Sequence, residues 1–256
     1  MIRQRLDPVR VVGVIQARCG SQRLPEKVMA PLAGRPVVEH VVTAVRAATI
    51  LDDVIVATTT EQADDELAAL CERLGVRVFR GSEDDVLGRF LGALEGDPAD
   101  VVVRHTADDP LLDPNIINSV VGHFLKGGCD YASNVIERTW PRGLDTEVVT
   151  RDALERSGTD TQEPQDREHV TMWVRRHPDE FTARNVPAPP SQTWPDLRLC
   201  IDTAEDQAML ERVFDALYEP GRILHIGAVV DWLRRHPEVA AINSDVEQKK
   251  VFGKTY

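Results

Sequence analysis

The stretch Val11-Val-Gly-Val-Ile-Gln16-Ala-Arg-Cys-Gly20-Ser-Gln-Arg-Leu-Pro-Glu-Lys27 joins an apolar run to a loop rich in cations. The run 11–16 predicts a buried, parallel strand, because strands covered on both faces are apolar along their length. Loops that follow strands in an open parallel sheet carry the ligand sites. We therefore expect the loop 17–27 to lie on the binding rim of such a sheet.

The rest of the chain alternates between apolar runs and amphipathic segments. Strands are predicted at 54–57, 76–79, 100–104 and 197–201, and helices at 36–48, 62–73, 84–95, 114–125, 166–177, 204–217 and 226–235. This alternation predicts an α/β fold with a doubly wound, mostly parallel sheet. We expect a single domain over 1–256, with an irregular insertion at 130–185 that begins with strand and loop.

The composition is that of a water-soluble globular protein. Of the 256 residues, 42% are hydrophobic and 28% charged, and no apolar run reaches the roughly 20 residues that a membrane span needs. The charged first residues do not resemble a secretory signal, so we expect a cytoplasmic protein that does not contact a membrane. Four cysteines stand far apart without a CxxC pair and are expected to be reduced thiols.

The charge distribution indicates a local anion site. A net charge of −12 disfavours binding to nucleic acid. Residues 1–35 nevertheless hold seven cations, namely Arg3, Arg5, Arg10, Arg18, Arg23, Lys27 and Arg35. Either this island is a solvated N-terminus, or part of it binds an anion.

The loop after the first strand has the composition of a triphosphate site. Gly20 lets the backbone bring its N–H groups close to a ligand, and Ser21 adds a hydroxyl donor. Cations at 18, 23 and 27 would neutralise phosphate charge. The loop matches neither GxxxxGK[ST] nor GxGxxG, which disfavours a Walker ATPase and a dinucleotide-binding dehydrogenase. A surface loop with ordinary salt bridges is the alternative.

Two predicted strands end in carboxylates. Asp108 and Asp109 follow the strand at 100–104, and Asp202 follows the one at 197–201. Carboxylates at the binding rim suit Mg²⁺, which takes one or two of them together with substrate phosphates. Turn and helix-cap chemistry is the alternative, and we interpret Asp113 as a helix cap only.

Together these segments resemble the cytidylyltransferase family of the spore-coat polysaccharide biosynthesis type, a relative of CMP-KDO synthetase and the CMP-sialate synthetases. The loop 16–27 resembles the family's QARxGSxRLPxK signature. Over about 11–250, further matching segments follow in family order: Phe79–Leu87, Asp130–Asn134, Gly143–Glu147, Arg167–Thr171, Ile201–Asp206 and Ile242–Lys249.

The resemblance implies a Rossmann-like nucleotidyltransferase fold, a homodimer, and Mg²⁺-dependent transfer of a cytidylyl group from CTP to a sugar-acid or other small acidic acceptor, with release of pyrophosphate. It implies nucleotide contacts from Gln16, Ala17, Arg18, Gly20, Ser21, Arg23, Lys27, Arg80 and Ser82. Asp108 and Asp202 would hold the metal, and the catalytic set would be Arg18, Lys27, Asp108 and Asp202. Acceptor contacts would come from Asn134, Arg142, Asp145, Glu147, Arg167, Glu168 and His169.

Three positions depart from the family pattern, which usually has Gly at Glu26 and Ala107 and often an acidic residue at Arg142. Three other functions stay open: transfer of another nucleotide, glycosyl transfer from a nucleotide-sugar, and a non-catalytic nucleotide-binding subunit. No general base is evident. His105 and His169 are candidates; the alternative for His105 is a core role, and for His169 a contact to Glu168 or to a second subunit.

Overall fold

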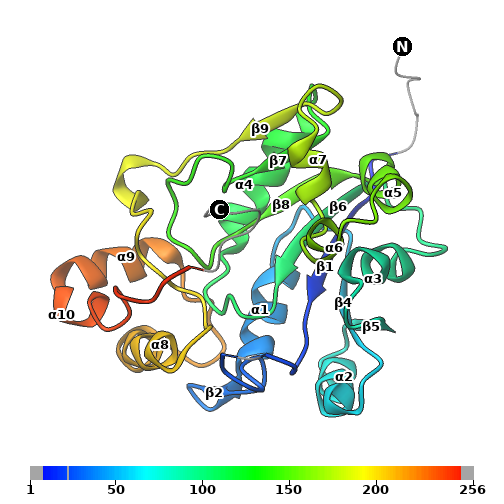
Figure 1. The fold of residues 1–256 in the computed structure, drawn as a ribbon. Helices are drawn as coiled ribbons and strands as arrows, with labels where there is room; N and C mark the ends of the chain where they lie inside the picture. The colour runs from blue at the N-terminus through cyan, green and yellow to red at the C-terminus, as the bar shows by residue number, and fades with distance from the viewer. Residues whose placement is uncertain (1–7, 22, 249–256) are drawn as a thin grey trace.

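The computed structural model describes residues 8–21 and 23–248, so Arg3 and Arg5 of the basic island lie outside the described residues. Its main feature is a seven-stranded sheet in the order β5-β4-β1-β6-β8-β7-β9. The strands are β1 (Val11–Gln16), β4 (Asp53–Thr59), β5 (Arg77–Gly81), β6 (Val101–Thr106), β7 (Tyr131–Ser133), β8 (Glu147–Thr150) and β9 (Ala183–Asn185). Strands β5, β4, β1 and β6 are parallel, whereas β8 is antiparallel to both β6 and β7. The predicted mostly parallel sheet is confirmed (Figure 1).

The register aligns the carboxyl ends of the central strands. Gln16 at the end of β1 pairs with Ala57 on one side and with Thr106 on the other. The backbone N–H of Ala107 donates to the carbonyl of Gln16 at 3.0 Å, one residue beyond β6. The loops that follow β1 and β6 therefore leave the sheet from the same rim.

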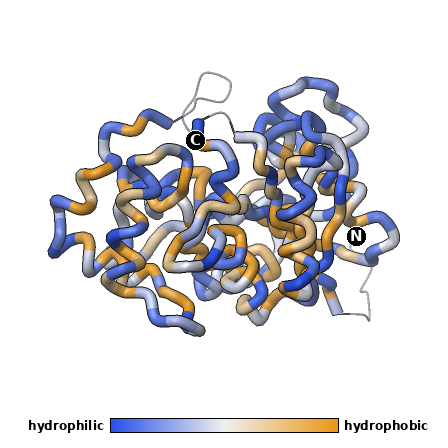
Figure 2. The backbone as a smooth tube through the Cα atoms, turned by 90° about the horizontal axis from the view of Figure 1, so that it is seen from below, coloured by the Kyte–Doolittle hydropathy of each residue, from blue (hydrophilic) through white to orange (hydrophobic). Residues whose placement is uncertain are grey.

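The sheet is covered on both faces, as its apolar strands predict. Ile15 and Val56 belong to one buried cluster, and their neighbours Val14 and Ile55 belong to a second cluster on the opposite face. This alternation follows from the pleat, which turns successive side chains to opposite sides. Figure 2 shows hydrophilic stretches mainly on the outer turns of the chain.

Helices fill both layers. They are α1 (Val37–Arg46), α2 (Asp65–Arg73), α3 (Val86–Ala93), α4 (Pro114–Leu125), α5 (Arg151–Asp160), α6 (Pro164–Glu168), α7 (Met172–Arg176), α8 (Ala204–Leu217), α9 (Ile226–Arg235) and α10 (Pro237–Ala240). Short elements are the hairpin β2 (Pro31–Leu32) with β3 (Arg35–Pro36), and two 3₁₀ turns at Gln62–Asp64 and Pro190–Gln192. In Figure 1, α8, α9 and α10 lie on the left and α3 and α5 on the right.

The predicted cap at Asp113 is confirmed, and its side chain also accepts from the N–H of Ile226 at the start of α9. The Asp113 side chain accepts from the N–H of Asn115 at the start of α4. Thr203 and Asp206 form a capping box at the start of α8, in which each side chain satisfies a backbone N–H of the first turn.

Two predicted elements differ. The helix expected at 166–177 is two short helices, α6 and α7, because the chain turns between them at Val170, whose φ is 55°. The strand expected at 197–201 is wrong: this segment pairs with the rest of the structure only through a bridge between Arg142 and Arg198. Strand β9 and helix α5 were not predicted. Among the described helices, none has the length and apolar character to cross a membrane.

Candidate active site

A cluster of opposite charges lies where the loops after β1 and β6 meet. The Nζ atom of Lys27 lies 2.5 Å from Oδ2 of Asp108 and 2.7 Å from Oδ1 of Asp202. These three side chains are 13%, 22% and 11% exposed, respectively, so they are reachable from solvent. The structure thus brings together three predicted catalytic residues that are up to 175 positions apart in the sequence.

The backbone fixes the two carboxylates side by side. The N–H of Ile201 donates to the carbonyl oxygen of Asp108 at 2.8 Å, which ties the two loops together. Oδ1 of Asp202 faces Lys27 and also accepts from Arg23 at 2.9 Å. Its Oδ2 atom faces Arg198 at 3.3 Å.

The charges in this cluster stabilise one another. Burial disfavours the ionised form of Asp202, but Lys27, Arg23 and Arg198 outweigh burial and lower the pKa of its carboxyl. Burial likewise disfavours the Lys27 ammonium, but the two carboxylates outweigh it and raise its pKa. Asp202 and Lys27 are therefore both ionised at neutral pH.

The carboxylate pair fits a magnesium ion. The ammonium at bonding distance from both side chains shows that this position stabilises a cation. Within 8–21 and 23–248, no group of three or more His, Cys, Asp or Glu side chains is arranged to hold a metal. Two carboxylates leave most of the octahedral shell of Mg²⁺ to phosphate oxygens and water, which is the usual arrangement with nucleotide substrates.

The loop after β1 is shaped by its own backbone bonds. The N–H groups of Ser21 and Glu26 both donate to the carbonyl of Cys19, at 2.7 and 3.0 Å. The N–H of Cys19 donates to buried Asp64 at 2.7 Å, which anchors the start of the loop. A Cβ atom on Gly20 would lie 2.7 Å from a carboxylate oxygen of Glu83, so a larger residue here would displace the flexible end of that side chain.

The departures from the family pattern have different structural consequences. Exposed Glu26 has a φ of 56°, in the left-handed region that glycine adopts without strain. Ala107 has no such φ, and its Cβ is buried. The backbone therefore favours glycine at position 26 and tolerates alanine at position 107.

The basic island of the N-terminal region divides into separate groups. Arg10 pairs with Asp97 beside the start of β1, and Arg35 pairs with Glu39 and Tyr218. Arg18 lies on the loop, where its Nη1 atom is 3.4 Å from Oε1 of Glu83. Only part of the island therefore surrounds the candidate site.

The end of β5 and the loop after it carry the residues expected near the base. The Arg80 guanidinium donates to the carbonyls of Thr59 and Glu61 and pairs with Asp65. The hydroxyl of Ser82 accepts from the N–H of Asp85 at 3.2 Å. Arg80 thus binds the turn after β4, and Ser82 binds its own loop.

The acceptor residues expected at 134–147 have several surroundings. Asn134 is buried and bonds to the backbone of Leu144 and Thr146, so it holds the loop together. Asp145 forms a two-pronged ion pair with Arg138, with both contacts at 2.9 Å. Burial and the adjacent Arg138 lower the pKa of the Arg142 guanidinium.

Glu147 lies in a cluster of polar side chains that is closed to solvent. Its carboxylate, 4% exposed, pairs with Arg104 and accepts hydrogen bonds from Tyr131 at 2.6 Å and Thr171 at 2.5 Å. Burial disfavours the charge, but Arg104 and Arg175 lower the pKa of Glu147 to about 2.

The segment expected at 167–169 lies at the end of α6. Arg167 pairs with Asp85 through two contacts of 2.9 and 2.7 Å, which joins this segment to the cap of α3. Glu168 and His169 are partly buried beside it. Among the described residues, Arg167 therefore bonds to Asp85 and not to Lys27, Asp108 or Asp202.

Three residues near the site were not predicted. Glu83 reaches the glycine loop, Arg89 donates from a buried position to the carbonyls of Ser82 and Glu83, and Arg198 supports Asp202. For Glu83, the matched segment at 79–87 was the only signal, and Arg89 lies two residues beyond that segment. Arg198 lies just outside the matched segment at 201–206.

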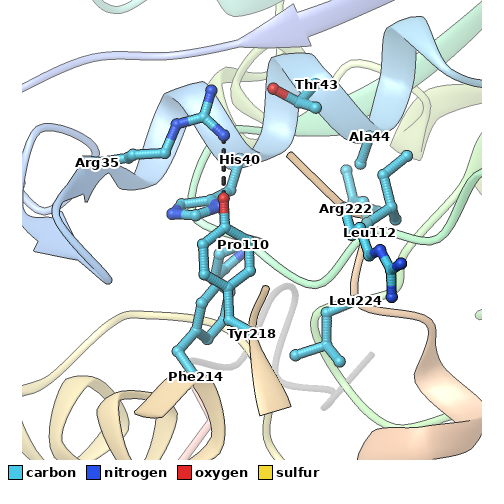
Figure 3. Close-up of a pocket in the computed structure, with 11 residues that line it drawn as sticks. Arg35, His40, Thr43, Ala44, Pro110, Leu112, Phe214, Tyr218, Arg222 and Leu224 are labelled. Carbon is cyan, nitrogen blue, oxygen red and sulfur yellow. Dashed lines mark hydrogen bonds between the residues drawn. The ribbon is translucent and has the colours of Figure 1, made fainter. Parts of the chain in front are cut away.

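A small cavity lies behind the loop that carries Asp108. Pro110 lines it, together with Arg35, His40, Phe214 and Tyr218 (Figure 3). Its volume of about 20 Å³ has room for roughly one water molecule, so it cannot hold a nucleotide. In Figure 3 the Tyr218 hydroxyl points to Arg35, a bond of 3.0 Å.

Known proteins are similar to this chain in fold and in sequence. The structure of a cytidylyltransferase from Leptospira borgpetersenii superposes with a TM-score of 0.86 at 28% identity, covering 95% of this chain and all of that one. The spore coat polysaccharide biosynthesis protein SpsF of Bacillus subtilis is 33% identical over 235 residues, 90% of this chain and 96% of its own. A 3-deoxy-manno-octulosonate cytidylyltransferase of Trichlorobacter lovleyi is 34% identical over 119 residues, 46% of each chain.

The fold and the charged rim define a nucleotidyltransferase. Residues 12–252 match the model of the cytidylyltransferase family. The chain belongs to this family and is an enzyme of the cytidylyltransferase class, as the resemblance implied.

Proposed function

We propose that this enzyme transfers a cytidylyl group from CTP to a sugar acid in a Mg²⁺-dependent reaction. The observation that carries the proposal is the Lys27 ammonium held between Asp108 and Asp202, next to the glycine loop after β1. A triphosphate and its metal need both a cationic loop and paired carboxylates. A nucleotide-sugar diphosphate would need fewer cations than this loop supplies, which makes glycosyl transfer a weaker candidate.

In the proposed reaction, an acceptor oxygen attacks the α-phosphorus of CTP. The new oxygen–phosphorus bond forms as the bond to the bridging oxygen breaks, pyrophosphate leaves, and the acceptor proton passes to solvent. Lys27, Arg18 and Arg23 would bind the triphosphate and stabilise the charge that develops on pyrophosphate. Asp108 and Asp202 would hold Mg²⁺, which supplies a Lewis acid for the phosphates.

The remaining predicted residues have narrower roles in this proposal. The backbone of Gln16, Ala17, Gly20 and Ser21 would line the triphosphate, and the loop of Arg80 and Ser82 would border the base. His105 is an unfavourable general base, because burial lowers its pKa to about 4 and a proton acceptor of that strength is weak at neutral pH.

The acceptor is proposed to be anionic because cations border its region. Arg142 lies beside Arg138 in the 134–147 loop, and a second cation nearby favours an anion between or beside them. The similarity to a 3-deoxy-manno-octulosonate cytidylyltransferase and to a spore coat polysaccharide protein supports a sugar acid for polysaccharide synthesis.

Asn134, Asp145 and Glu147 would shape this loop, and Arg167, Glu168 and His169 would border it. We also propose that the chain is one domain, that 130–185 contributes to a homodimer, and that the enzyme works in the cytoplasm.

The test is pyrophosphate release from CTP, UTP, ATP and GTP with a panel of sugar acids and neutral sugars, with the product identified by mass. Wild type is expected to require CTP, an acid and Mg²⁺. Asp108→Asn is expected to lose at least about 100-fold in kcat. Asp215→Asn, which changes an exposed aspartate on α8 by the same chemistry, is the matched control. Product from another nucleotide, or none from any, would contradict the proposal.

A further inference from the structure

The C-terminal segment Ile242–Gln248 matches the family pattern, but the proposed reaction gives it no role. It wraps back to the start of α8 and bonds there at two points. Nδ2 of buried Asn243 lies 2.8 Å from Oδ1 of Asp206 and 3.2 Å from the carbonyl of Arg198. Five residues later, Oε1 of Gln248 accepts from Nη1 of Arg198 at 2.5 Å.

Arg198 is the centre of this arrangement. Its side chain is 4% exposed. Its Nε and Nη2 atoms form a two-pronged pair with Asp206, at 3.1 and 3.0 Å. Nη2 also faces Oδ2 of Asp202 at 3.3 Å. Its planar guanidinium is thus held along both edges, by Asp206 on one and by Gln248 on the other.

The two oxygens of Asp202 have different partners as a result. Oδ1 faces the reaction site, with Lys27 at 2.7 Å and Arg23 at 2.9 Å. Oδ2 is turned away from the site toward Arg198. The backbone N–H of Asp202 donates to Asp206 at 3.0 Å, so the same buried aspartate orients both the main chain and the arginine.

The segment 242–248 also lies beside the loop that carries Arg23. A hollow of about 490 Å³ lies between it and the loop of Arg23, with Thr203 and Glu205 from the start of α8 in its wall. Ile242 and Val246 line the opposite side. The segment therefore reaches Asp202 through Arg198, and across this hollow it faces Arg23, which pairs with Asp202.

We propose that Arg198, anchored by Gln248, is the positioning residue that orients Asp202 for the metal. It fixes Oδ2 so that Oδ1 points into the site, and the segment 242–248 completes the support. The inference rests on the proposed function, in which Asp202 is a metal ligand. Residues that orient a ligand from outside the coordination shell usually change metal affinity by about 10- to 100-fold when mutated.

The test measures binding of Mn²⁺ to the full chain by electron paramagnetic resonance, with CTP present. Arg198→Lys is expected to weaken Mn²⁺ binding by about 10- to 100-fold. Gln248→Ala, which removes one hydrogen bond to a charged group, is expected to weaken it by about threefold and to lower the melting temperature by at most a few degrees. Gln207→Ala is the control, because its amide on α8 bonds only to Glu211 among the recorded contacts.

The possible outcomes distinguish a failure of this inference from a failure of the proposed function. Weaker Mn²⁺ binding in both variants, with the control unchanged, supports the inference. Unchanged Mn²⁺ binding in Gln248→Ala and Arg198→Lys overturns it and leaves the proposed function intact. Wild type that binds no Mn²⁺ with CTP overturns both. A lower melting temperature with unchanged metal affinity would assign Arg198 a purely structural role.

Discussion

Two clusters of cations and carboxylates lie at neighbouring parts of the same sheet. They differ in their exposure to solvent and in whether protein groups already satisfy all of their polar atoms. At the rim, Lys27 lies between Asp108 and Asp202 with solvent access. In the interior, Arg104 pairs with Glu147, whose second oxygen accepts from two hydroxyls. In the buried cluster, other protein side chains already bond to both oxygens of Glu147. The rim cluster is open to solvent, and under the proposed function its carboxylates exchange the ammonium for a metal and its phosphates.

The largest effect is expected from the rim cluster. In Lys27→Ala, kcat is expected to fall by about 100- to 1000-fold, because a cation that stabilises the leaving group is lost. The two carboxylates then face each other without an ammonium, so Mg²⁺ should raise the melting temperature of the variant more than that of wild type. Steady-state kinetics and thermal melts with and without Mg²⁺ measure both effects. Near-wild-type turnover would remove Lys27 from the catalytic set.

The interior cluster is expected to show the opposite behaviour. Glu147→Gln leaves Arg104 buried without its charge partner and is expected to lower the free energy of unfolding by about 3–5 kcal/mol. Activity per folded molecule should change little. Urea denaturation followed by assays of the folded fraction separates the two. A stable variant with a raised KM for the acceptor would instead place Glu147 in the acceptor site, as the sequence resemblance implies.

The same cluster predicts a pH dependence. The folded-state pKa of Glu147 is lowered to about 2, against about 4.3 in an unfolded chain. Its contribution to stability is therefore complete above about pH 4.3 and is lost as the pH falls toward 2. Wild type should lose more stability than Glu147→Gln across that range. Parallel acid melts of the two proteins would contradict the lowered pKa.

A smaller effect is expected where an exposed acid meets the glycine loop. Glu83 and Arg18 are each about 40% exposed, so their pair is worth at most about 1 kcal/mol. Glu83→Gln releases Arg18 for phosphate and is expected to tighten CTP binding by up to about fivefold. Calorimetric titration with CTP measures this, and weaker binding would show that Glu83 assists the nucleotide instead.

The smallest effect is expected at the edge of the same loop. Glu26→Gly removes left-handed strain of about 1–2 kcal/mol but adds about 0.5–1 kcal/mol of chain entropy to the unfolded state. The net gain in unfolding free energy should be roughly 0.5–1 kcal/mol, measured by chemical denaturation. A clear loss of stability would mean that the Glu26 side chain contributes contacts of its own.

The positions of Lys27 and Asp108 at the rim could be predicted because the end of a buried strand can be recognised in a sequence. An apolar run followed by a polar loop places Lys27 and Asp108 on one edge of a parallel sheet without knowledge of side-chain geometry. The carboxyl end of the 197–201 segment placed Asp202 at the site even though that segment is not a strand, because its single bridge to Arg142 still directs it to the rim.

The interior and the supporting contacts could not be predicted in the same way. Whether Glu147 faces an acceptor or a buried arginine depends on the pairing of β8 with β6, which sequence alone does not give. Arg167 was expected beside the acceptor. In the structure it pairs with Asp85, which lies 82 positions away in the sequence. Arg198 needs partners from α8 and from the C-terminal segment, and such long-range contacts leave no local pattern.

The central claim is tested most directly by calorimetric titration of CTP into the wild-type protein and Asp108→Asn, each with and without Mg²⁺. The account predicts CTP binding that tightens with Mg²⁺ in wild type and no longer responds to Mg²⁺ in the variant. At about 100 times Kd, CTP with Mg²⁺ should also stabilise the wild-type fold by roughly 2.7 kcal/mol. CTP binding that is indifferent to Mg²⁺ and to Asp108, or no binding at all, would contradict it.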